Sequence, residues 1–179
     1  MRLTDIETFV VGNPPPHFGG RYFVFVKITT DSGVSGVGEA YCLPFHPKVV
    51  VQMIEDVFER CVAGHDPHHI EAMWRRVYSS GFTQNPDLSL MGVLSALEMA
   101  CWDIVGKEAN QPVYNLLGGK VHEKLRSYTY IYPKAGDKTD VYRDPVLAAE
   151  RALEYVEQGF TAVKFDPAGR YRAVDGRQL

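Results

Sequence analysis

Two polar residues, Lys164 and Asp166, stand at the end of an apolar segment that is typical of a buried parallel strand. Side chains two residues apart on a strand point to the same side, and sites in α/β sheets collect at the carboxyl ends of the strands. A lysine in such a place can bind a carboxylate or, when it is desolvated, act as a base. The spacing alone favours a simpler alternative, which is an ion pair between Lys164 and Asp166.

Two loops also carry residues that could bind a ligand. The first contains His17 and Arg21 beside two glycines, and the second contains His46 beside aromatic residues. Both loops could act as lids over a polar, anionic ligand. Taken alone, each loop is explained more simply by its turn-forming residues and by aromatic cover of the core. A further carboxylate, Glu39, could be a ligand or a hydrogen-bond anchor for backbone amides, and the second interpretation is favoured.

The composition excludes several other kinds of function. The net charge of −3 gives no electrostatic basis for binding nucleic acid or an anionic membrane. The three cysteines are too scattered for a zinc site or a disulfide framework, and Cys61 and Cys101 are expected to be buried free thiols. No apolar run approaches membrane-spanning length, and the N-terminus lacks the apolar region of a signal peptide. We therefore expect a protein of the reducing cytoplasm.

The candidate residues must be positioned by two differently built regions. In the first region, the segments 3–11, 21–30 and 34–40 predict a three-stranded antiparallel sheet. Four helices follow, and each is expected to begin near a proline: Pro47, Pro67, Pro86 and Pro112. Strands and helices that are segregated along the sequence are typical of an α+β domain.

The second region begins after Gly119 and contains a strand, a helix and a second strand. The strands are expected over 127–132 and 160–165, and Asp144 is expected to cap the helix between them. The apolar face of this helix is expected to include Ala149, Ala152, Leu153 and Val156. A βαβ unit requires a parallel sheet. Because two strands cannot close such a sheet, we expect further strands beyond Leu179, and we expect the 179-residue chain alone to be inactive.

Several segments resemble the mandelate racemase and muconate-lactonizing branch of the enolase superfamily. The most specific segments are the helical stretch 95–107 and the stretch 111–119 that follows it, while 159–164 matches the family's second barrel strand. Shorter matches are found at 36–40 and 63–67. The resemblance covers essentially the whole chain. It is stronger evidence for the fold than for the substrate, since the helical motif consists mostly of small packing residues.

The resemblance implies an α+β capping domain, with a three-stranded antiparallel sheet and a helical bundle, followed by the first βαβ unit of a modified TIM-type (β/α)7β barrel. The expected boundaries are 1–125 for the capping domain and 126–179 for the start of the barrel. The resemblance also implies removal of a proton α to a carboxylate, with Mg²⁺ stabilising the enediolate. The family's metal ligands lie on later barrel strands, so no residue here is expected to bind Mg²⁺. As partners we expect a small carboxylate substrate and further copies of the chain in a homo-oligomer.

Lys164 matches the first lysine of the family's Lys-x-Lys pair, which lies near the substrate carboxylate, and Asp166 replaces the second lysine, a customary proton base. An aspartate of ordinary pKa is a weak base for this proton, so the replacement disfavours racemisation. The lid residues His17, Arg21 and His46 favour a hydroxylated substrate. The resemblance thus favours dehydration of a sugar acid to a 2-keto-3-deoxy acid, with racemase, epimerase or cycloisomerase activity as alternatives. An alternative of another class is a non-catalytic α+β binding or assembly module.

Overall fold

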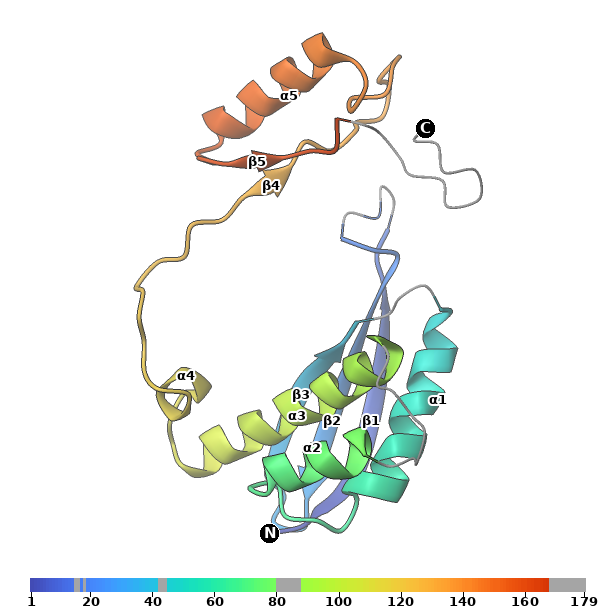
Figure 1. Cartoon of the computed structure of the whole chain (residues 1–179), viewed down its shortest axis with the longest axis vertical. Helices are drawn as coiled ribbons and strands as arrows, with labels where there is room; N and C mark the ends of the chain where they lie inside the picture. Colours follow the sequence, from blue (N-terminus) through green and yellow to red (C-terminus); the bar gives the residue numbers. More distant parts are fainter. Residues whose placement is uncertain (15–16, 18, 42–44, 80–87, 168–179) are drawn as a thin grey trace. The chain divides into compact units, whose positions relative to one another are not determined.

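The computed structural model describes residues 1–14, 17, 19–41, 45–79 and 88–167. Contacts between Cα atoms divide the chain into two compact units, Met1–Lys120 and Val121–Leu179, which we call unit 1 and unit 2 (Figure 1). Each unit is described by itself.

Unit 1 contains the predicted three-stranded antiparallel sheet, which is confirmed. Its strands are β1 (Leu3–Gly12), β2 (Tyr22–Thr30) and β3 (Ser35–Ala40), with β2 in the centre. Alternate residues of β2 are buried, as the period of two predicts: Val24, Val26, Ile28 and Thr30. The alternation therefore identifies the face of the sheet that packs against the helices.

Of the four helices that the structure describes in unit 1, the first and the third contact that face of the sheet, and the other two pack against the third (Figure 1). They are α1 (Pro47–Val57), which continues as the π-helical turn η1 (Phe58–Val62), α2 (Ile70–Tyr78), α3 (Leu88–Glu108) and α4 (Val113–Leu116). Helix α3 contacts both β2 and β3, and α1 contacts β2. Strands followed by helices that cover one sheet face make the α+β architecture that the sequence predicts.

Two glycines of β3 allow α3 to lie directly on the sheet. A Cβ atom on Gly36 would lie 2.0 Å from the carbonyl oxygen of Ala100, and one on Gly38 would lie 2.0 Å from that of Ala96. No side chain fits at such distances, so only glycine is compatible with this packing. The small residues Ala96 and Ala100, both 0% exposed, provide the matching surface on the helix.

Helix α3 has the length and apolar composition of a membrane-spanning helix, contrary to the expectation from the sequence. Its apolar side chains are accounted for by the packing of unit 1, because Leu94, Leu97 and Ile104 are 0% exposed and belong to the core cluster. The core helix of a folded domain meets the same test as a membrane span, so this feature is weak evidence for a membrane.

The two cysteines on helices of unit 1 are free and buried, as predicted. Burial raises the pKa of the Cys101 thiol to about 12, and its Sγ lies 3.9 Å from Sδ of Met73. A thiol with so high a pKa is not a nucleophile at neutral pH. Cysteine chemistry is therefore excluded at this position.

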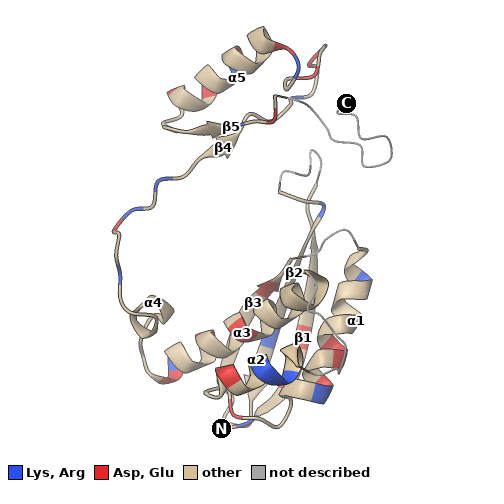
Figure 2. Cartoon of the chain, in the orientation of Figure 1, with Lys and Arg blue, Asp and Glu red and all other residues tan. Residues whose placement is uncertain are grey.

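Charged side chains of both signs are interspersed along the helices of unit 1 (Figure 2). Three helical pairs are spaced four residues apart: Asp56–Arg60, Glu71–Arg75 and Asp103–Lys107. Because most of these side chains are exposed to solvent, which screens their charges, the pairs contribute little to stability.

Unit 2 is a βαβ unit, as predicted. Its elements are β4 (Thr129–Tyr130), α5 (Pro145–Glu157) and β5 (Val163–Lys164), and the two strands pair in parallel (Figure 1). Asp144 caps α5, since its Oδ1 accepts hydrogen bonds from two backbone amides of the first turn. Both strands are shorter than predicted, because only a few residues of each make ladder hydrogen bonds with the other.

The predicted apolar face of α5 is wrong in part. Leu153 is 61% exposed and Val156 is 55% exposed, whereas the buried side chains of the helix are Ala148 and Arg151. The apolar residues of α5 form two stripes, and the stripe that packs in the core of unit 2 contains Leu147, Ala148, Ala152 and Tyr155. Helical periodicity alone does not decide which of two apolar stripes is covered.

Arg151, which is only 3% exposed, fastens α5 to the segment that follows β4. Its guanidinium donates a 2.6 Å hydrogen bond to the carbonyl oxygen of Tyr132 and a 2.9 Å bond to Oδ1 of Asp137. The pKa of Asp137 is lowered, chiefly by the hydrogen bond from the Lys134 amide and also by Arg151. A buried arginine needs such partners, because an unpaired buried charge is strongly destabilising.

Candidate functional site

A cleft of about 580 Å³ lies in unit 1, between the segment that leads into β2 and the segment that joins β3 to α1. We call it the lid cleft. Its described lining residues are Gly19, Gly20, Arg21, Tyr22, Phe23, Glu39, Ala40, Tyr41, Phe45, His46 and Pro47. The fold therefore brings together Arg21 and His46, which are far apart in the sequence.

His46 is held at the cleft because it caps α1. Its Nδ1 accepts a 3.2 Å hydrogen bond from the backbone amide of Lys48, and Pro47 occupies the first turn of the helix. Since Nδ1 accepts, the proton of the neutral ring is on Nε2. His46 can therefore donate a hydrogen bond from Nε2 to a ligand oxygen. Its ring centroid lies 6.3 Å from that of Tyr22.

His17 is held by its own loop and is not among the residues that line the cleft. Its backbone φ is 62°, and Nδ1 lies 2.6 Å from the carbonyl oxygen of Asn13. A carbonyl oxygen can only accept, so Nδ1 carries the proton and Nε2 is left as an acceptor. The Asn13 side-chain amide also donates to the carbonyl oxygen of Gly20, which ties the loop together. The structure thus gives His17 a loop-forming role, and ligand contact stays a prediction.

Glu39 lines the lid cleft together with Arg21, and sequence reasoning did not select it as a ligand-binding residue. A signal was present, since Gly36, Gly38 and Ala40 are buried and the period of two turns Glu39 outwards. A cleft with an arginine, a carboxylate and a histidine N–H offers groups for both a carboxylate and several hydroxyls of a ligand. Aromatic side chains supply apolar walls.

The second candidate region is the sheet of unit 2. In the parallel register Tyr130 lies opposite Lys164. Helix α5 covers one face of this sheet, where Ile131 and Val163 pack with Ala148. The period of two therefore places Lys164 on the other face, at the carboxyl end of β5.

Lys164 is exposed, and tyrosine side chains adjoin its ammonium group. Nζ lies 5.0 Å from the ring centroid of Tyr130 and 5.5 Å from that of Tyr128. A hydrogen bond with Tyr130, followed by the charge interaction with Tyr128, raises the pKa of Lys164 above its ordinary value. Because its pKa is raised above an already high ordinary value, Lys164 is a cation at neutral pH.

Asp166 follows β5 and is exposed. Among the residues that the structure describes, no ion pair joins it to Lys164. The simple ion pair that the spacing favours is therefore not formed here, and both charges are available for other partners. In the described part of the chain, no group of three or more His, Cys, Asp or Glu side chains could hold a metal ion.

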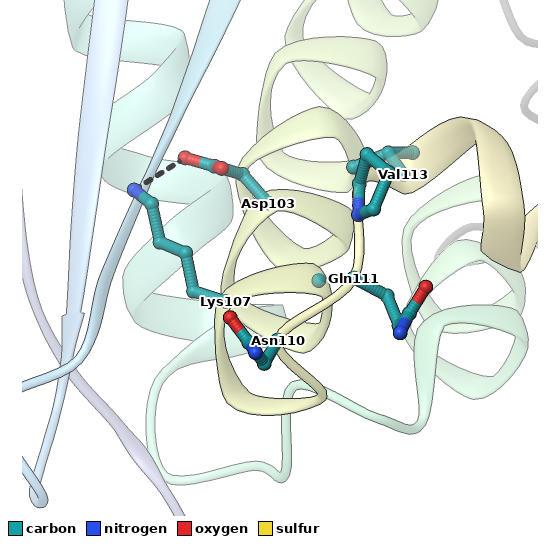
Figure 3. A pocket seen from close by; sticks show the side chains of 7 residues that line it. Asp103, Lys107, Asn110, Gln111 and Val113 are labelled. Carbon is teal, nitrogen blue, oxygen red and sulfur yellow. Dashed lines mark hydrogen bonds and ion pairs between the residues drawn. The ribbon is translucent and has the colours of Figure 1, made fainter.

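A smaller pocket, of about 370 Å³, lies beside the C-terminal end of α3 (Figure 3). Oδ2 of Asp103 accepts hydrogen bonds from the amide of Val37, at 2.9 Å, and from Nζ of Lys107, at 2.8 Å. Lys107 also donates to the carbonyl oxygen of Ser35, at 2.8 Å. Because β3 is an edge strand, these bonds satisfy backbone groups that would otherwise be unpaired. The charged pair therefore has a structural role.

Comparison with known proteins identifies the fold. Residues 15–118 match the family model described as the N-terminal domain of mandelate racemase / muconate lactonizing enzyme. A solved structure of a candidate mandelate racemase/muconate lactonizing enzyme from Labrenzia alexandrii DFL-11 is 63% identical, with a TM-score of 0.91. The match covers 99% of this chain and 44% of that one.

Two curated relatives carry names that state a reaction. The chain is 41% identical over 139 residues to a D-galactonate dehydratase family member, RspA, of Cellvibrio japonicus, covering 78% of this chain and 33% of that protein. It is 36% identical over 167 residues to the D-gluconate/D-galactonate dehydratase of Picrophilus torridus, covering 92% of this chain and 41% of that protein. The chain therefore spans well under half of the length of these relatives.

The fold and the family match agree with each other. A three-stranded antiparallel sheet with helices on one face, followed by a parallel βαβ unit, is the architecture that the resemblance implied. The match to the family model covers more than half of the chain and most of unit 1. The chain belongs to the mandelate racemase / muconate lactonizing enzyme family of the enolase superfamily, and it carries the family's N-terminal domain.

Proposed function

We propose that this chain forms the N-terminal part of a sugar-acid dehydratase that removes the proton α to a carboxylate and releases water to give a 2-keto-3-deoxy acid. The printed names of the relatives from Cellvibrio japonicus and Picrophilus torridus support the substrate class. The observation that carries the reaction type is the pair at the end of β5, where Lys164 is a cation and Asp166 takes the place of a second lysine.

Lys164 is proposed to bind the substrate carboxylate. The proton α to a carboxylate is weakly acidic, and its removal develops charge on the carboxylate oxygens. A protonated lysine stabilises that charge better than a neutral one, because its attraction grows as the charge develops. A bound Mg²⁺ ion would add Lewis-acid stabilisation of the same charge. The proposal also includes a general base that removes the proton. It further includes Asp166 as a catalytic residue.

The lid cleft is proposed to select the substrate. Arg21 can bind a carboxylate or hydroxyls, the Nε2–H of His46 can donate to an oxygen, and Glu39 can accept from hydroxyl groups. His17 is retained as a lid residue that shapes its loop. These side chains suit a polyhydroxylated acid better than an apolar one. We further propose that the capping domain comprises 1–125, that the barrel begins within 126–179, and that the protein forms a homo-oligomer in the cytoplasm.

The proposal is tested with the protein in its full natural length, incubated with Mg²⁺ and a library of aldonic and uronic acids. Formation of a 2-keto-3-deoxy acid, detected as its semicarbazone, is the expected result for at least one substrate. A matched variant, Lys164→Met, should lose most of this activity and retain its fold. Activity that survives undiminished in Lys164→Met would contradict the assigned role. Catalytic inactivity towards the whole library would favour a binding or assembly module instead.

A further inference from the structure

The two-stranded sheet of unit 2 has two chemically different faces. One face packs against α5 through Ile131 and Val163. The other face carries a row of tyrosines at every second position of the β4 segment, Tyr128, Tyr130 and Tyr132, together with Lys164. The successive ring centroids lie 6.2 and 5.7 Å apart. The three rings therefore form a continuous aromatic row beside the lysine.

Lys164 lies over two of these rings. The distances of 5.0 Å to the Tyr130 centroid and 5.5 Å to the Tyr128 centroid are within the range in which an ammonium group is attracted by an aromatic face. The register fixes this contact, because Tyr130 is the direct partner of Lys164 across the ladder. Two rings on a neighbouring strand therefore restrict where the flexible lysine side chain can place its charge.

We propose that Tyr130 and Tyr128 are positioning residues, which hold the Lys164 ammonium group at the carboxyl end of β5 as a fixed cation. Besides Lys164, the charged or titratable groups of the described residues on this face are the phenols of Tyr128, Tyr130 and Tyr132 and, after the end of β5, the Asp166 carboxylate. Helix α5 lies on the opposite face and contributes none of them. Lys164 thus serves as a carboxylate anchor and does not carry protons during the reaction. This last consequence rests on the proposed function, whereas the effect of the rings on Lys164 does not.

The test measures Lys164 itself, without substrate. The full-length protein is treated with a limiting amount of acetic anhydride at a series of pH values, and acetylation of the Lys164 peptide is quantified by mass spectrometry. Tyr130→Leu removes both the ring and the hydroxyl, and Tyr130→Phe keeps the ring. Tyr128→Leu replaces a largely exposed ring, so it should spare the fold. Tyr114→Leu, at a half-exposed tyrosine of α4, is the matched control.

Removal of a ring should make Lys164 more reactive at a fixed pH, because less of the amine is held as a cation. We expect about a fivefold faster acetylation in Tyr130→Leu, about a twofold change in Tyr130→Phe and in Tyr128→Leu, and no change in Tyr114→Leu. The pH midpoint of labelling should fall in the same order. An unchanged rate and midpoint in both folded leucine variants, Tyr130→Leu and Tyr128→Leu, would overturn the positioning role.

A kinetic experiment separates this inference from the proposed function. In an active dehydratase, Tyr130→Phe should retain more activity than Tyr130→Leu. The decrease in kcat/KM of Tyr130→Leu should be larger than its decrease in folding stability explains. Faster acetylation without any dehydratase activity would support the role of the rings and refute the proposed reaction. Dehydratase activity with unchanged acetylation of Lys164 would support the proposed reaction and refute the role of the rings.

Discussion

The two units of the chain bury apolar surface in different ways. In unit 1 the strands and the helices α1, α2 and α3 contribute to one continuous cluster, in which Val26, Leu97 and Ile104 are 0% exposed. In unit 2 the buried apolar side chains of the described residues are Ile131, Val141 and Ala148, and a buried arginine lies beside them. Unit 1 is therefore held by close packing, whereas unit 2 depends on a polar network that fastens one helix to one segment.

This difference has a functional meaning. The packed sheet and helices of unit 1 provide a rigid base for the two segments that form the lid cleft. The small core of unit 2 supports a strand end that presents Lys164. Substitutions that test packing should therefore act most strongly in unit 1, and substitutions that test polar contacts should act in unit 2.

The largest effect is expected for a core leucine. Leu97→Ala should lower the free energy of unfolding of unit 1 by about 4 kcal/mol, because Leu97 is 0% exposed and its loss leaves a cavity. Urea unfolding of the 179-residue chain measures this change, since both tryptophans, Trp74 and Trp102, lie in unit 1. The matched control is Leu117→Ala, at a leucine of unit 1 that is 63% exposed, which should change stability by less than about 0.5 kcal/mol. Equal losses in the two variants would contradict the comparison.

A nearly equal effect is expected where β3 touches α3. Gly38→Ala should destabilise unit 1 by about 3 kcal/mol, because the new methyl group would meet the backbone carbonyl of Ala96, which cannot move independently. Gly12→Ala is the control, since nothing lies within 4 Å of a Cβ atom there. The same urea titration should show little change for the control. A stable Gly38→Ala variant would show that the strand and helix are not in direct contact.

In unit 2 the largest effect is expected at the buried arginine. Arg151→Met should destabilise this unit by about 2 kcal/mol, because the Tyr132 carbonyl loses its donor and Asp137 loses its partner. Hydrogen exchange of the amides around Asp137 should increase, while exchange in α3 stays unchanged. Protection that persists around Asp137 would refute the role of the network.

The same network predicts a dependence on pH. The folded-state pKa of Asp137 is lowered below its ordinary value of 3.8, so its stabilising contribution is fully present well above pH 3.8 and is lost as the pH falls below 3.8 through the lower folded-state pKa. Hydrogen exchange of unit 2 should therefore accelerate relative to unit 1 as the pH is lowered from 5 to 3, after correction for the intrinsic rates. Asp137→Asn should abolish most of this difference, and an unchanged pH profile in that variant would contradict the assignment.

The smallest effect is expected at the edge of the sheet. Asp103→Ala should cost about 1 kcal/mol, because the Val37 amide loses its acceptor and the pair with Lys107 is lost. Glu71→Ala removes the ion pair with Arg75, which lies within one helix and does not involve a strand. This variant should leave the urea midpoint unchanged. Equal midpoints for the two variants would mean that the edge bonds do not stabilise β3.

Much of the fold was predictable from local patterns. The alternation in β2, the proline Pro47 in the first turn of α1 and the cap Asp144 predict elements that the structure confirms. The helix expected to begin at Pro67 begins instead at Ile70. The carboxylate of Asp66 accepts a hydrogen bond from the backbone amide of His68, which forms a separate turn before the helix. The helix start expected at Pro86 lies outside the described residues.

The candidate site was less predictable, because its contacts join segments that are distant in sequence. Arg21 and His46 meet only after β1, β2 and β3 pair, and Glu39 joins them through the register of β3. The contact between Lys164 and Tyr130 likewise depends on the parallel register of β4 and β5. The exposed stripe of α5 was mistaken for its buried face, since both stripes are apolar. Tertiary pairing therefore supplies the information that periodicity lacks.

The most direct test of the account is to follow the full-length protein with an aldonic acid and Mg²⁺ in D₂O by ¹H NMR. The account predicts that the C2 proton signal of one substrate disappears together with the appearance of a 3-deoxy product that carries deuterium at C3. Exchange of the C2 proton for deuterium without loss of water, which would indicate racemisation, or no change in any acid tested, would contradict it.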